Sequence, residues 1–505
     1  MSFAPQTSPP DSADAEDAAL ATRIGRMLGG GSGPRMARLF HRLLALIFLI
    51  AWISLGVQVR VLIGARGLLP VADVFAAAHA DQPAVSFADF PTLLWLAHGD
   101  AVLVAGTIVG ALLALLALAG LRPRLCFALS TILYFSYATA GRLFLSFQWD
   151  NLLLECGFLA VFLPADRPSP AIHFLFRVLL FKLYFESGIA KWQSNLHDWQ
   201  DGSAMTVYYE TAPLPTALAW FAHNLPAWWH HVESRAVLLL ELVVPFAIFG
   251  TRRARLCAAV AFTGFQILNI ATANYGFFCY LALALNVFLL ADPARLEDEE
   301  APLLPPPTLA RRGLVALGVT AFLGASLIEA LFNFSDGGPL LARFSGVFAL
   351  TQRTRVVNTY HLFAAITRER IEPEFQTLDA GADLADQGAW RAHDLWHKPG
   401  DPTRRPDFVA PHQPRVDFQL WFHGLSFRRR PAYMAVLLER MCEDAPAVQP
   451  LFQSPLPPHP AAVRVVYWQY HFTAPGDAPS SAVKAWWRRD RVATAAPILC
   501  PPATP

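Results

Sequence analysis

The sequence predicts an α-helical multi-pass membrane bundle of about nine transmembrane helices, followed by a β-rich domain outside the membrane. Two observations predict this class. Of the 505 residues, 54% are hydrophobic and only 16% are charged, whereas a soluble domain usually carries about 25% charged residues. The apolar residues are concentrated in long segments, and the chain becomes polar and rich in Pro and Trp after residue 333. The net charge of +1 gives no basis for nucleic-acid binding, so we expect none.

Residues 1–35 are rich in Ser, Pro, Asp and Gly, a composition that predicts a disordered cytoplasmic tail. The first apolar run begins near Ala37, too far into the chain for a cleavable signal peptide, and it is long enough to be a signal anchor. A spanning helix needs about 20 mostly apolar residues. We therefore expect a transmembrane domain over residues 36–335. The predicted spans are 37–59, 101–120, 125–146, 151–164, 171–191, 235–250, 254–273, 275–291 and 312–332.

The arginines beside these spans predict the orientation, because basic residues favour the cytoplasmic side of a membrane. The basic clusters are Arg23, Arg26, Arg35, Arg38 and Arg42; Arg122 and Arg124; Arg167; Arg252, Arg253 and Arg255; and Arg311 and Arg312. All five clusters fall on one side if the chain crosses nine times. The N-terminus is then cytoplasmic, and both the loop 192–234 and the region 336–505 face the periplasm or a lumen.

The region 336–505 is predicted to be a β-rich domain. Its β-branched and aromatic run Val463–Thr473 (VRVVYWQYHFT) is typical of a strand, and Pro431–Met441 predicts a short amphipathic helix. Cys442 and Cys500 can pair if this domain faces an oxidising compartment, but the sequence leaves their distance open. The other four cysteines fall in apolar segments and are interpreted as small core residues.

Charged side chains within the predicted spans are functional candidates, because charge inside a membrane is costly. Lys182 and Glu186 lie four residues apart on one helix face, so a structural ion pair is the simpler interpretation. Arg177 lies on the opposite face and is a candidate for a bend or for snorkelling. Lys191 lies on the same face at the outer end. It either snorkels to the interface or, with a pKa lowered by burial, acts as a base.

A polar break at residues 147–151 precedes the span 151–164. Asp150 is positioned to cap the following helix. Glu155 lies one turn inside the span and needs a partner, for which we propose Arg142.

The loop 192–234 is unusually rich in aromatic residues and histidines. One interpretation is an amphipathic segment at the outer membrane interface, and the other is a binding lip over a cavity among the helices. Its binding candidates are Trp199, Asp201, Tyr208, Tyr209 and Glu210. The histidines lack metal-ligand spacing, and the sequence carries no Walker, GxSxG or dinucleotide motif, so we expect neither metal nor cofactor.

Several motifs follow one another along the chain. They are Gln58–Pro70 (QVRVLIGARGLLP), Phe147–Phe162 (FQWDNLLLECGFLAVF), Lys191–Glu210 with YYET at 208–211, Glu241–Pro245 (ELVVP), Asn358–Tyr360, Lys398–Pro402 with Arg404–Pro406, Arg415–Phe422 (RVDFQLWF) and Trp486–Trp487. Over roughly residues 40–500 this ordered series resembles the lipase maturation factor family. His361 stands where the family pattern has Gly, and the first 35 residues match nothing.

The resemblance implies a polytopic membrane protein that helps dimeric lipases to fold and assemble. In animals such proteins lie in the endoplasmic reticulum membrane with a lumenal C-terminal domain that meets the client; a bacterial member would lie in the inner membrane. The expected partners are the lipid bilayer and a client lipase or other secreted protein. Further client-binding candidates are Trp421, Trp486 and Trp487.

A weaker, local resemblance suggests an alternative. Tyr184–Lys191 (YFESGIAK) followed by Trp199–Met205 (WQDGSAM) is similar to a stretch of the vitamin K-dependent γ-glutamyl carboxylase, in which the corresponding Lys is the base. The alternative function is therefore a membrane enzyme with Lys191 as base, although we favour a non-enzymatic maturation factor. A transporter ranks third, because charged residues within spans permit it but no duplicated halves are visible.

Overall fold

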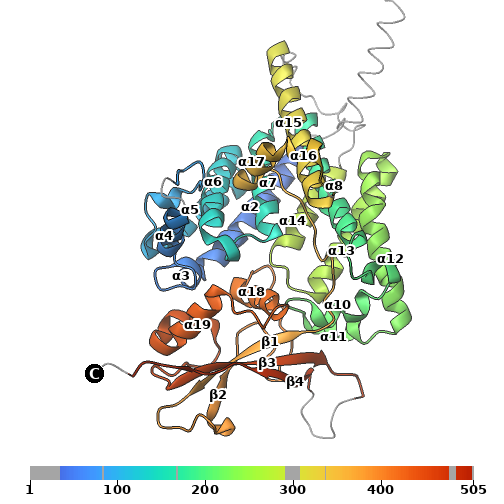
Figure 1. Ribbon diagram of the computed structural model, residues 1–505. Helices are drawn as coiled ribbons and strands as arrows, with labels where there is room; N and C mark the ends of the chain where they lie inside the picture. Colours follow the sequence, from blue (N-terminus) through green and yellow to red (C-terminus); the bar gives the residue numbers. More distant parts are fainter. Residues whose placement is uncertain are drawn as a thin grey trace, which may run out of the picture.

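The computed structural model describes residues 34–81, 85–166, 169–290, 308–335, 337–476 and 485–502. A bundle of helices, from α2 to α17, is followed by a smaller C-terminal part made of one sheet and three helices (Figure 1). The predicted tail up to residue 33, Arg167 and residues 291–307, which connect the last two predicted spans, lie outside the described residues.

Local chemistry sets the helix ends of the bundle. Pro123 and Pro170 stand in the first turns of α6 and α8, where a missing N–H leaves no hydrogen bond unmade. The side chains of Thr251 and Thr308 accept backbone N–H groups and cap α13 and α15. The main bundle helices are α2 (Pro34–Gly56), α3 (Val59–Ile63), α4 (Val71–Asp81), α5 (Asp100–Leu118), α6 (Pro123–Gly141), α7 (Gln148–Phe162), α8 (Pro170–Trp192), α12 (Ala227–Leu242), α13 (Arg252–Thr272), α14 (Phe278–Leu285), α15 (Leu309–Phe334), α16 (Pro339–Ala342) and α17 (Ser345–Thr354).

Each of the nine predicted spans overlaps a helix, but the helices differ in length and polarity. Among the described residues, four helices are long and apolar enough to cross a membrane: α2, α5, α13 and α15. Helix α8 has 23 residues but carries buried charges, and α7 has only 15. Helix α14 has eight residues, and a short 3-10 turn extends it to Leu289. The structure therefore confirms a largely helical, apolar body, and nine crossings stay a prediction.

The loop 192–234 folds into short helices rather than one long amphipathic segment. It contains α9 (Asp198–Asp201), α10 (Met205–Thr211), α11 (Ala217–His223) and the first half of α12. Several aromatic side chains on it are exposed: Trp192, Phe221, Trp228 and Trp229. Exposed Trp residues are typical of a membrane–water interface. Their exposure favours the interpretation of this loop as a segment at the outer membrane interface.

The C-terminal part contains an antiparallel sheet of five strands in the order β2-β1-β3-β4, with β5 also paired to β3. The predicted strand is found as β3 and the predicted helix as α19. Helices α18 and α19 pack against this sheet. Its elements are β1 (Ile371–Leu378), β2 (Trp390–His393), α18 (Arg415–Gly424), α19 (Ala432–Glu443), α20 (Ala445–Val448), β3 (Ala462–Phe472), β4 (Trp487–Thr494) and β5 (Ile498–Leu499).

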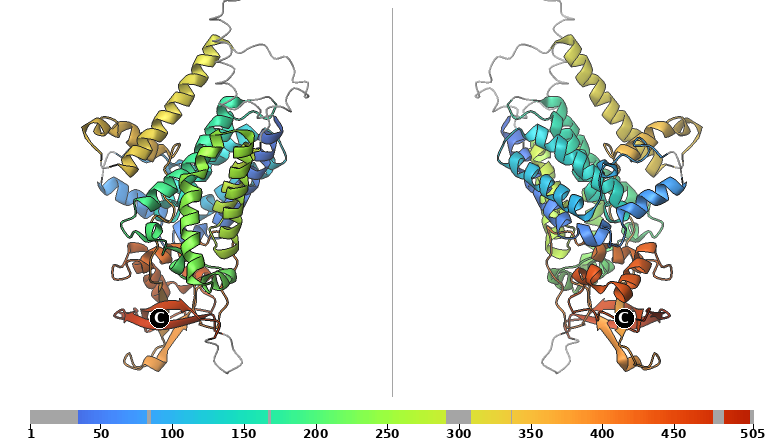
Figure 2. Two further views of the ribbon diagram at one scale, coloured as in Figure 1. Left: turned by 90° about the vertical axis from the view of Figure 1, so that its right-hand side faces the viewer. Right: turned by 90° about the vertical axis from the view of Figure 1, so that its left-hand side faces the viewer.

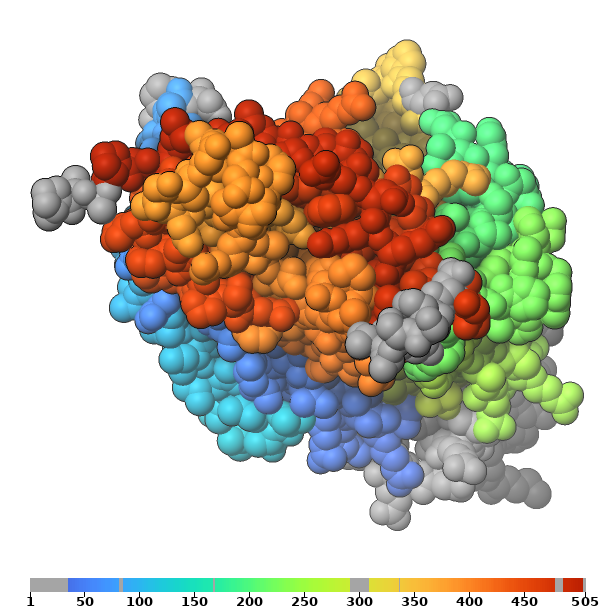
Figure 3. Space-filling model, turned by 90° about the horizontal axis from the view of Figure 1, so that it is seen from below, coloured from blue at the N-terminus to red at the C-terminus, as the bar shows by residue number. Residues whose placement is uncertain are grey.

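The two parts share one core. Buried apolar side chains of the bundle, such as Phe48, and of the sheet, such as Phe375 and Val465, belong to a single continuous cluster. Helices α18 and α19 lie between the sheet and the bundle, while α15 points away from the other helices (Figure 2). Seen from below, the sheet covers much of the lower end of the bundle (Figure 3).

The cysteines follow the sequence analysis with one exception. Cys442 in α19 and Cys500 form a disulfide, so the pairing that the sequence left open is present in the structure. Cys126, Cys156 and Cys279 are buried. Cys257 on α13 is exposed, because that helix turns one face away from the bundle.

Candidate functional site

The segment between α17 and β1, residues 355–370, connects the bundle to the C-terminal part. It runs along the ends of α7 and α8 without regular structure. Buried carboxylates of the bundle hold it by its backbone. Glu155 accepts hydrogen bonds from the backbone N–H of Asn358 at 3.1 Å and from the hydroxyl of Tyr360 at 2.7 Å. Glu186 accepts from the backbone N–H of Tyr360 at 2.8 Å.

The ion pairs of α7 and α8 differ from those predicted. Lys182 donates to Glu155 at 2.9 Å, and both side chains are buried. The predicted Lys182–Glu186 pair is therefore wrong, because Glu186 is turned to the connecting segment. Arg142 is not the partner of Glu155 either. It is exposed after the end of α6, and its guanidinium lies 5.2 Å from the ring centre of Phe90.

Asp150 forms the most buried ion pair between the two parts. Arg415 at the start of α18 donates to it through two nitrogens, at 2.8 and 2.9 Å, and the side chains are 0% and 1% exposed. The hydroxyl of Tyr134 also donates to Asp150, at 2.6 Å. Because α7 begins at Gln148 and shows no side-chain cap, the predicted capping role of Asp150 is wrong. A bidentate Arg–carboxylate pair fixes orientation as well as distance.

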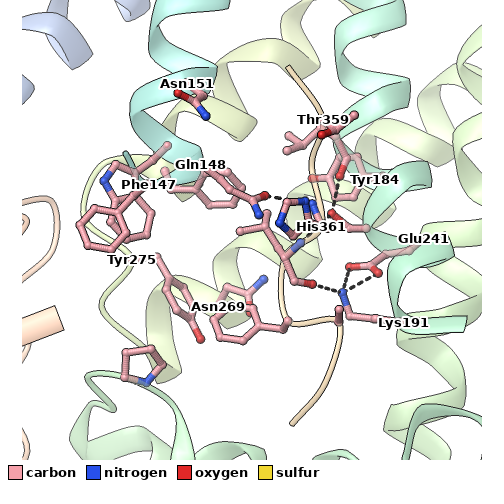
Figure 4. A pocket seen from close by; sticks show the side chains of 18 of the residues that line it. Phe147, Gln148, Asn151, Tyr184, Lys191, Glu241, Asn269, Tyr275, Thr359 and His361 are labelled. Carbon is pink, nitrogen blue, oxygen red and sulfur yellow. Dashed lines mark hydrogen bonds and ion pairs between the residues drawn. The ribbon is translucent and has the colours of Figure 1, made fainter. Parts of the chain in front are cut away.

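Lys191 lies in a closed ion pair with Glu241 of α12. The two carboxylate oxygens of Glu241 are 2.7 and 3.0 Å from its Nζ. Lys191 also donates to the carbonyl of Leu362 at 2.8 Å, and its ammonium lies 5.2 Å from the ring of Trp199 (Figure 4). A buried amine whose hydrogen bonds go to a carboxylate and a backbone carbonyl of neighbouring elements ties those elements together, which favours a structural role for Lys191 over that of a base.

Arg177, the remaining charged candidate of α8, is buried and donates to the carbonyl of Phe288 at 3.1 Å. It therefore neither snorkels nor reaches the C-terminal part.

Two of the loop candidates, Glu210 and Trp199, contact the C-terminal part and the connecting segment, respectively. Glu210 accepts from the backbone N–H of Phe472 at 2.7 Å and lies 3.0 Å from Nδ1 of His471. Trp199 donates through its indole to the carbonyl of Phe363 at 3.2 Å. Trp421 of α18 donates to the carbonyl of Thr211 at 2.7 Å.

The remaining candidates lie in different surroundings. The hydroxyl of Tyr209 donates to Glu233. Trp487 is buried and stacks on Phe472 with ring centres 4.3 Å apart. Trp486 is half-buried, with its ring centre 5.8 Å from that of Trp220. Asp201 is exposed, and hydrogen bonds from Ser203 lower the pKa of its carboxyl.

A second buried charge cluster stabilises the C-terminal part itself. Glu372 lies 2.7 Å from a guanidinium nitrogen of Arg370 and 2.7 Å from Nζ of Lys398. Burial lowers the pKa of Lys398 to about 8, and the carboxylate of Glu372 opposes this shift. Lys398 is the first residue of the motif Lys398–Pro402, so this residue of the motif contributes a buried ion pair to the fold.

A cavity of about 670 Å³ lies where the bundle, the connecting segment and α18 meet. Its wall includes Phe147 just before α7, Asn151 of α7, Tyr184 of α8 and the ring of His361, and Lys191 with Glu241 lies on one side (Figure 4). Tyr208 also lines it, with its hydroxyl 2.6 Å from that of Tyr275. A volume of this size is typical of small-molecule sites. Among the described residues, no group of His, Cys, Asp and Glu side chains is arranged to hold a metal ion.

Sequence reasoning missed three residues of this arrangement. Arg415 and Glu241 lie within the quoted motifs, but neither was assigned as a partner. The sequence did indicate that such partners exist, because a buried carboxylate such as Asp150 and a buried amine such as Lys191 each need a counter-charge. Tyr360 gave no such signal, since the sequence does not show which helix ends a connecting segment follows.

The fold and these contacts define a polytopic membrane protein whose helix bundle holds a mixed helix-and-sheet part in a fixed position. The family model for the lipase maturation factor transmembrane domain matches residues 35–296, and the model for the lipase maturation factor C-terminal domain matches residues 356–497. The chain belongs to the lipase maturation factor family.

Animal relatives agree with this assignment over most of their length. The chain is 30% identical to lipase maturation factor 1 of Bos taurus, covering 91% of this chain and 88% of that protein. It is 29% identical to lipase maturation factor 2 of Gallus gallus, covering 92% and 81%, respectively. It is 28% identical to lipase maturation factor 1 of Homo sapiens, covering 90% and 86%. No solved structure matches the chain. The predicted resemblance is confirmed.

Proposed function

We propose that this protein is a membrane-anchored maturation factor that assists the folding and assembly of a secreted lipase. The family match over about nine-tenths of the chain carries this proposal. The buried Asp150–Arg415 pair supports it, because the pair fixes the C-terminal part against the bundle. A client-binding surface on that part would then keep one distance and one orientation relative to the membrane.

The rival function, a membrane enzyme with Lys191 as base, is not favoured. A base needs a free lone pair beside the proton that it removes, whereas Lys191 is paired with Glu241 and donates to Leu362.

We further propose nine crossings, a cytoplasmic N-terminus and a C-terminal part in the periplasm or lumen. The Arg clusters of the sequence support this orientation. The Cys442–Cys500 disulfide supports it as well, because disulfides persist in oxidising compartments. The membrane is that of the endoplasmic reticulum in a eukaryote and the inner membrane in a bacterium.

The client contacts are also a proposal. Among the predicted candidates, Trp421 and Trp486 are half-buried and Asp201 is exposed, so these three retain surface for a client. Phe422 and Leu425, beside Trp421, are exposed apolar side chains. A half-folded client exposes apolar surface of its own, which such a patch is suited to cover.

The experiment uses the whole chain, because removing the bundle would expose Arg415 and other groups that it buries. The gene is deleted in its host, and the specific activity of each secreted lipase is measured per mole of lipase protein. We expect a lipase that is made but inactive and that regains activity when the gene is restored. It should also co-purify with the full-length protein in mild detergent. Full lipase activity in the deletion strain would exclude the proposal.

A further inference from the structure

The side chain of Arg355 lines the cavity of about 670 Å³ and has no part in the proposed maturation role. Arg355 is the first residue of the connecting segment and is half-buried, and its guanidinium donates to the carbonyl of Leu145 at 2.9 Å. Among the described residues no carboxylate is paired with it, since Asp150, whose charge acts on it, is bound by Arg415. A guanidinium stays charged at pH 7, and a charge removed from water without a counter-charge is costly. An anion in the cavity would supply that counter-charge.

The other charges on the cavity wall compensate one another. Of the residues that the structure describes, those that line the cavity and can carry a charge near neutral pH are Lys191, Glu241, Arg355 and His361. Lys191 is paired with Glu241. Burial lowers the pKa of His361, which leaves its ring neutral at pH 7. Arg355 therefore leaves the wall with one positive charge, which a ligand with one negative charge would balance.

Gln148 supplies a second donor on the same wall. Its Oε1 accepts the backbone N–H of His361 at 3.0 Å, so the other end of this side-chain amide is the donor (Figure 4). Within the described part of the chain, that amide nitrogen has no hydrogen-bond acceptor. Gln148 follows Leu145, whose carbonyl binds Arg355, by three positions, so the amide and the guanidinium both lie near the start of α7. Two such donors suit a carboxylate, which accepts through both of its oxygens.

Much of the remaining wall is apolar or aromatic, with side chains from α8, α12, α13 and α14: Leu183, Val237, Phe265 and Phe278. Burying an acyl chain against such a wall is favourable. The volume of the cavity suits a drug-sized molecule, which is the size of a lipid with a single chain. Under the orientation proposed above, the start of α7 and the end of α8 lie at the outer face of the membrane. An amphiphile can therefore enter from the outer leaflet.

We propose that the cavity binds a long-chain fatty acid. Its carboxylate pairs with the guanidinium of Arg355 and accepts from the amide of Gln148, and its acyl chain lies along the apolar wall. A carboxylate carries the one negative charge that the wall lacks, whereas a phosphate monoester carries about −1.5 to −2. The proposal does not depend on the lipase client, so its failure would leave the maturation role untouched.

The test uses the full-length protein in phosphatidylcholine nanodiscs. A fatty acid with a diazirine in its acyl chain is added and irradiated, and the labelled residues are mapped by mass spectrometry. The competitors, all of one chain length, are the unlabelled fatty acid, the fatty alcohol and lysophosphatidic acid. We expect labels on cavity residues such as Leu183 and Phe278, removed by the fatty acid at a concentration about tenfold lower than by the alcohol.

Three results would overturn the proposal. The first is labelling only on the lipid-facing surface of the helices. The second is competition by the fatty alcohol that equals or exceeds that by the fatty acid, which would show that the charge of Arg355 does not select the ligand. The third is equal or better competition by lysophosphatidic acid, which would show that the site takes a phosphate.

A variant of Arg355 links the selectivity to this residue. Arg355→Gln removes the charge and keeps a donor for the carbonyl of Leu145, so the preference for the acid over the alcohol should disappear. The matched control is Arg353→Gln, which removes an exposed arginine beside Asp89 on the surface and should leave the preference unchanged. A folded Arg355→Gln protein with the wild-type preference would overturn the proposal. If this variant does not fold, the comparison of acid with alcohol on the wild type decides.

Discussion

Asp150 and Arg415 are 265 positions apart in sequence, yet they form a fully buried, bidentate pair. Removing one partner of such a pair leaves an uncompensated buried charge, which costs about 3–5 kcal/mol. Asp150→Asn should therefore destabilise the protein by about 3 kcal/mol and lower its unfolding temperature in detergent. Asp73→Asn, which changes an exposed carboxylate on α4, is the control and should leave the unfolding temperature unchanged. Equal unfolding temperatures for the two variants would contradict this account of the pair.

His423 of α18 gives a pH-dependent contribution to stability. Burial, with the charge of Arg430, lowers the pKa of His423 to about 4 from its ordinary 6.5, and its ring nitrogen lies 3.0 Å from the hydroxyl of Tyr467. The unfolded chain takes up a proton first as the pH falls. Stability is therefore lost between about pH 6.5 and 4. The free energy of unfolding of the His423→Gln variant should fall less steeply over this range than that of the wild type; an unchanged slope would show that His423 does not contribute.

At the scale of elements, periodicity and hydropathy predicted the helices well, and the strand β3 and helix α19 were predicted nearly to the residue. The partners of the buried charges were not predicted. A helical wheel places Lys182 beside Glu186, but the neighbouring helix α7 supplies Glu155 instead. The partner of a buried charge depends on which helices pack together. The periodicity of a single sequence predicts the helices but does not show which of them are neighbours.

The connecting segment should be released when its carboxylate is lost. Glu155→Gln weakens the hydrogen bonds to Asn358 and Tyr360 and leaves Lys182 without its counter-charge. We expect trypsin to cut after the exposed Arg368 several times faster in this variant than in the wild type. Asp73→Asn, at an exposed site on α4, is the control. Unchanged cleavage at Arg368 would show that Glu155 does not hold the segment.

At the scale of the whole molecule, the number of crossings decides which side the C-terminal part faces. Nine crossings put residue 505 on the far side of the membrane from the N-terminus. Alkaline phosphatase fused at the C-terminus should then be active, since it folds only in an oxidising compartment, whereas green fluorescent protein at the same place should be dark. A fluorescent fusion in the cytosol would contradict the proposed orientation.

We propose that the Lys191–Glu241 pair stabilises the fold rather than acting as a catalytic base. Lys191→Met alone leaves Glu241 buried without a partner and should destabilise the protein, whereas Lys191→Met with Glu241→Leu replaces the pair by apolar side chains of similar size, an exchange that is often neutral. The measurement is the specific activity of the client lipase in the deletion host that carries the double variant at normal abundance. We predict lipase activity close to that with the wild-type gene. An abundant, stable double variant that leaves the lipase inactive would contradict the claim.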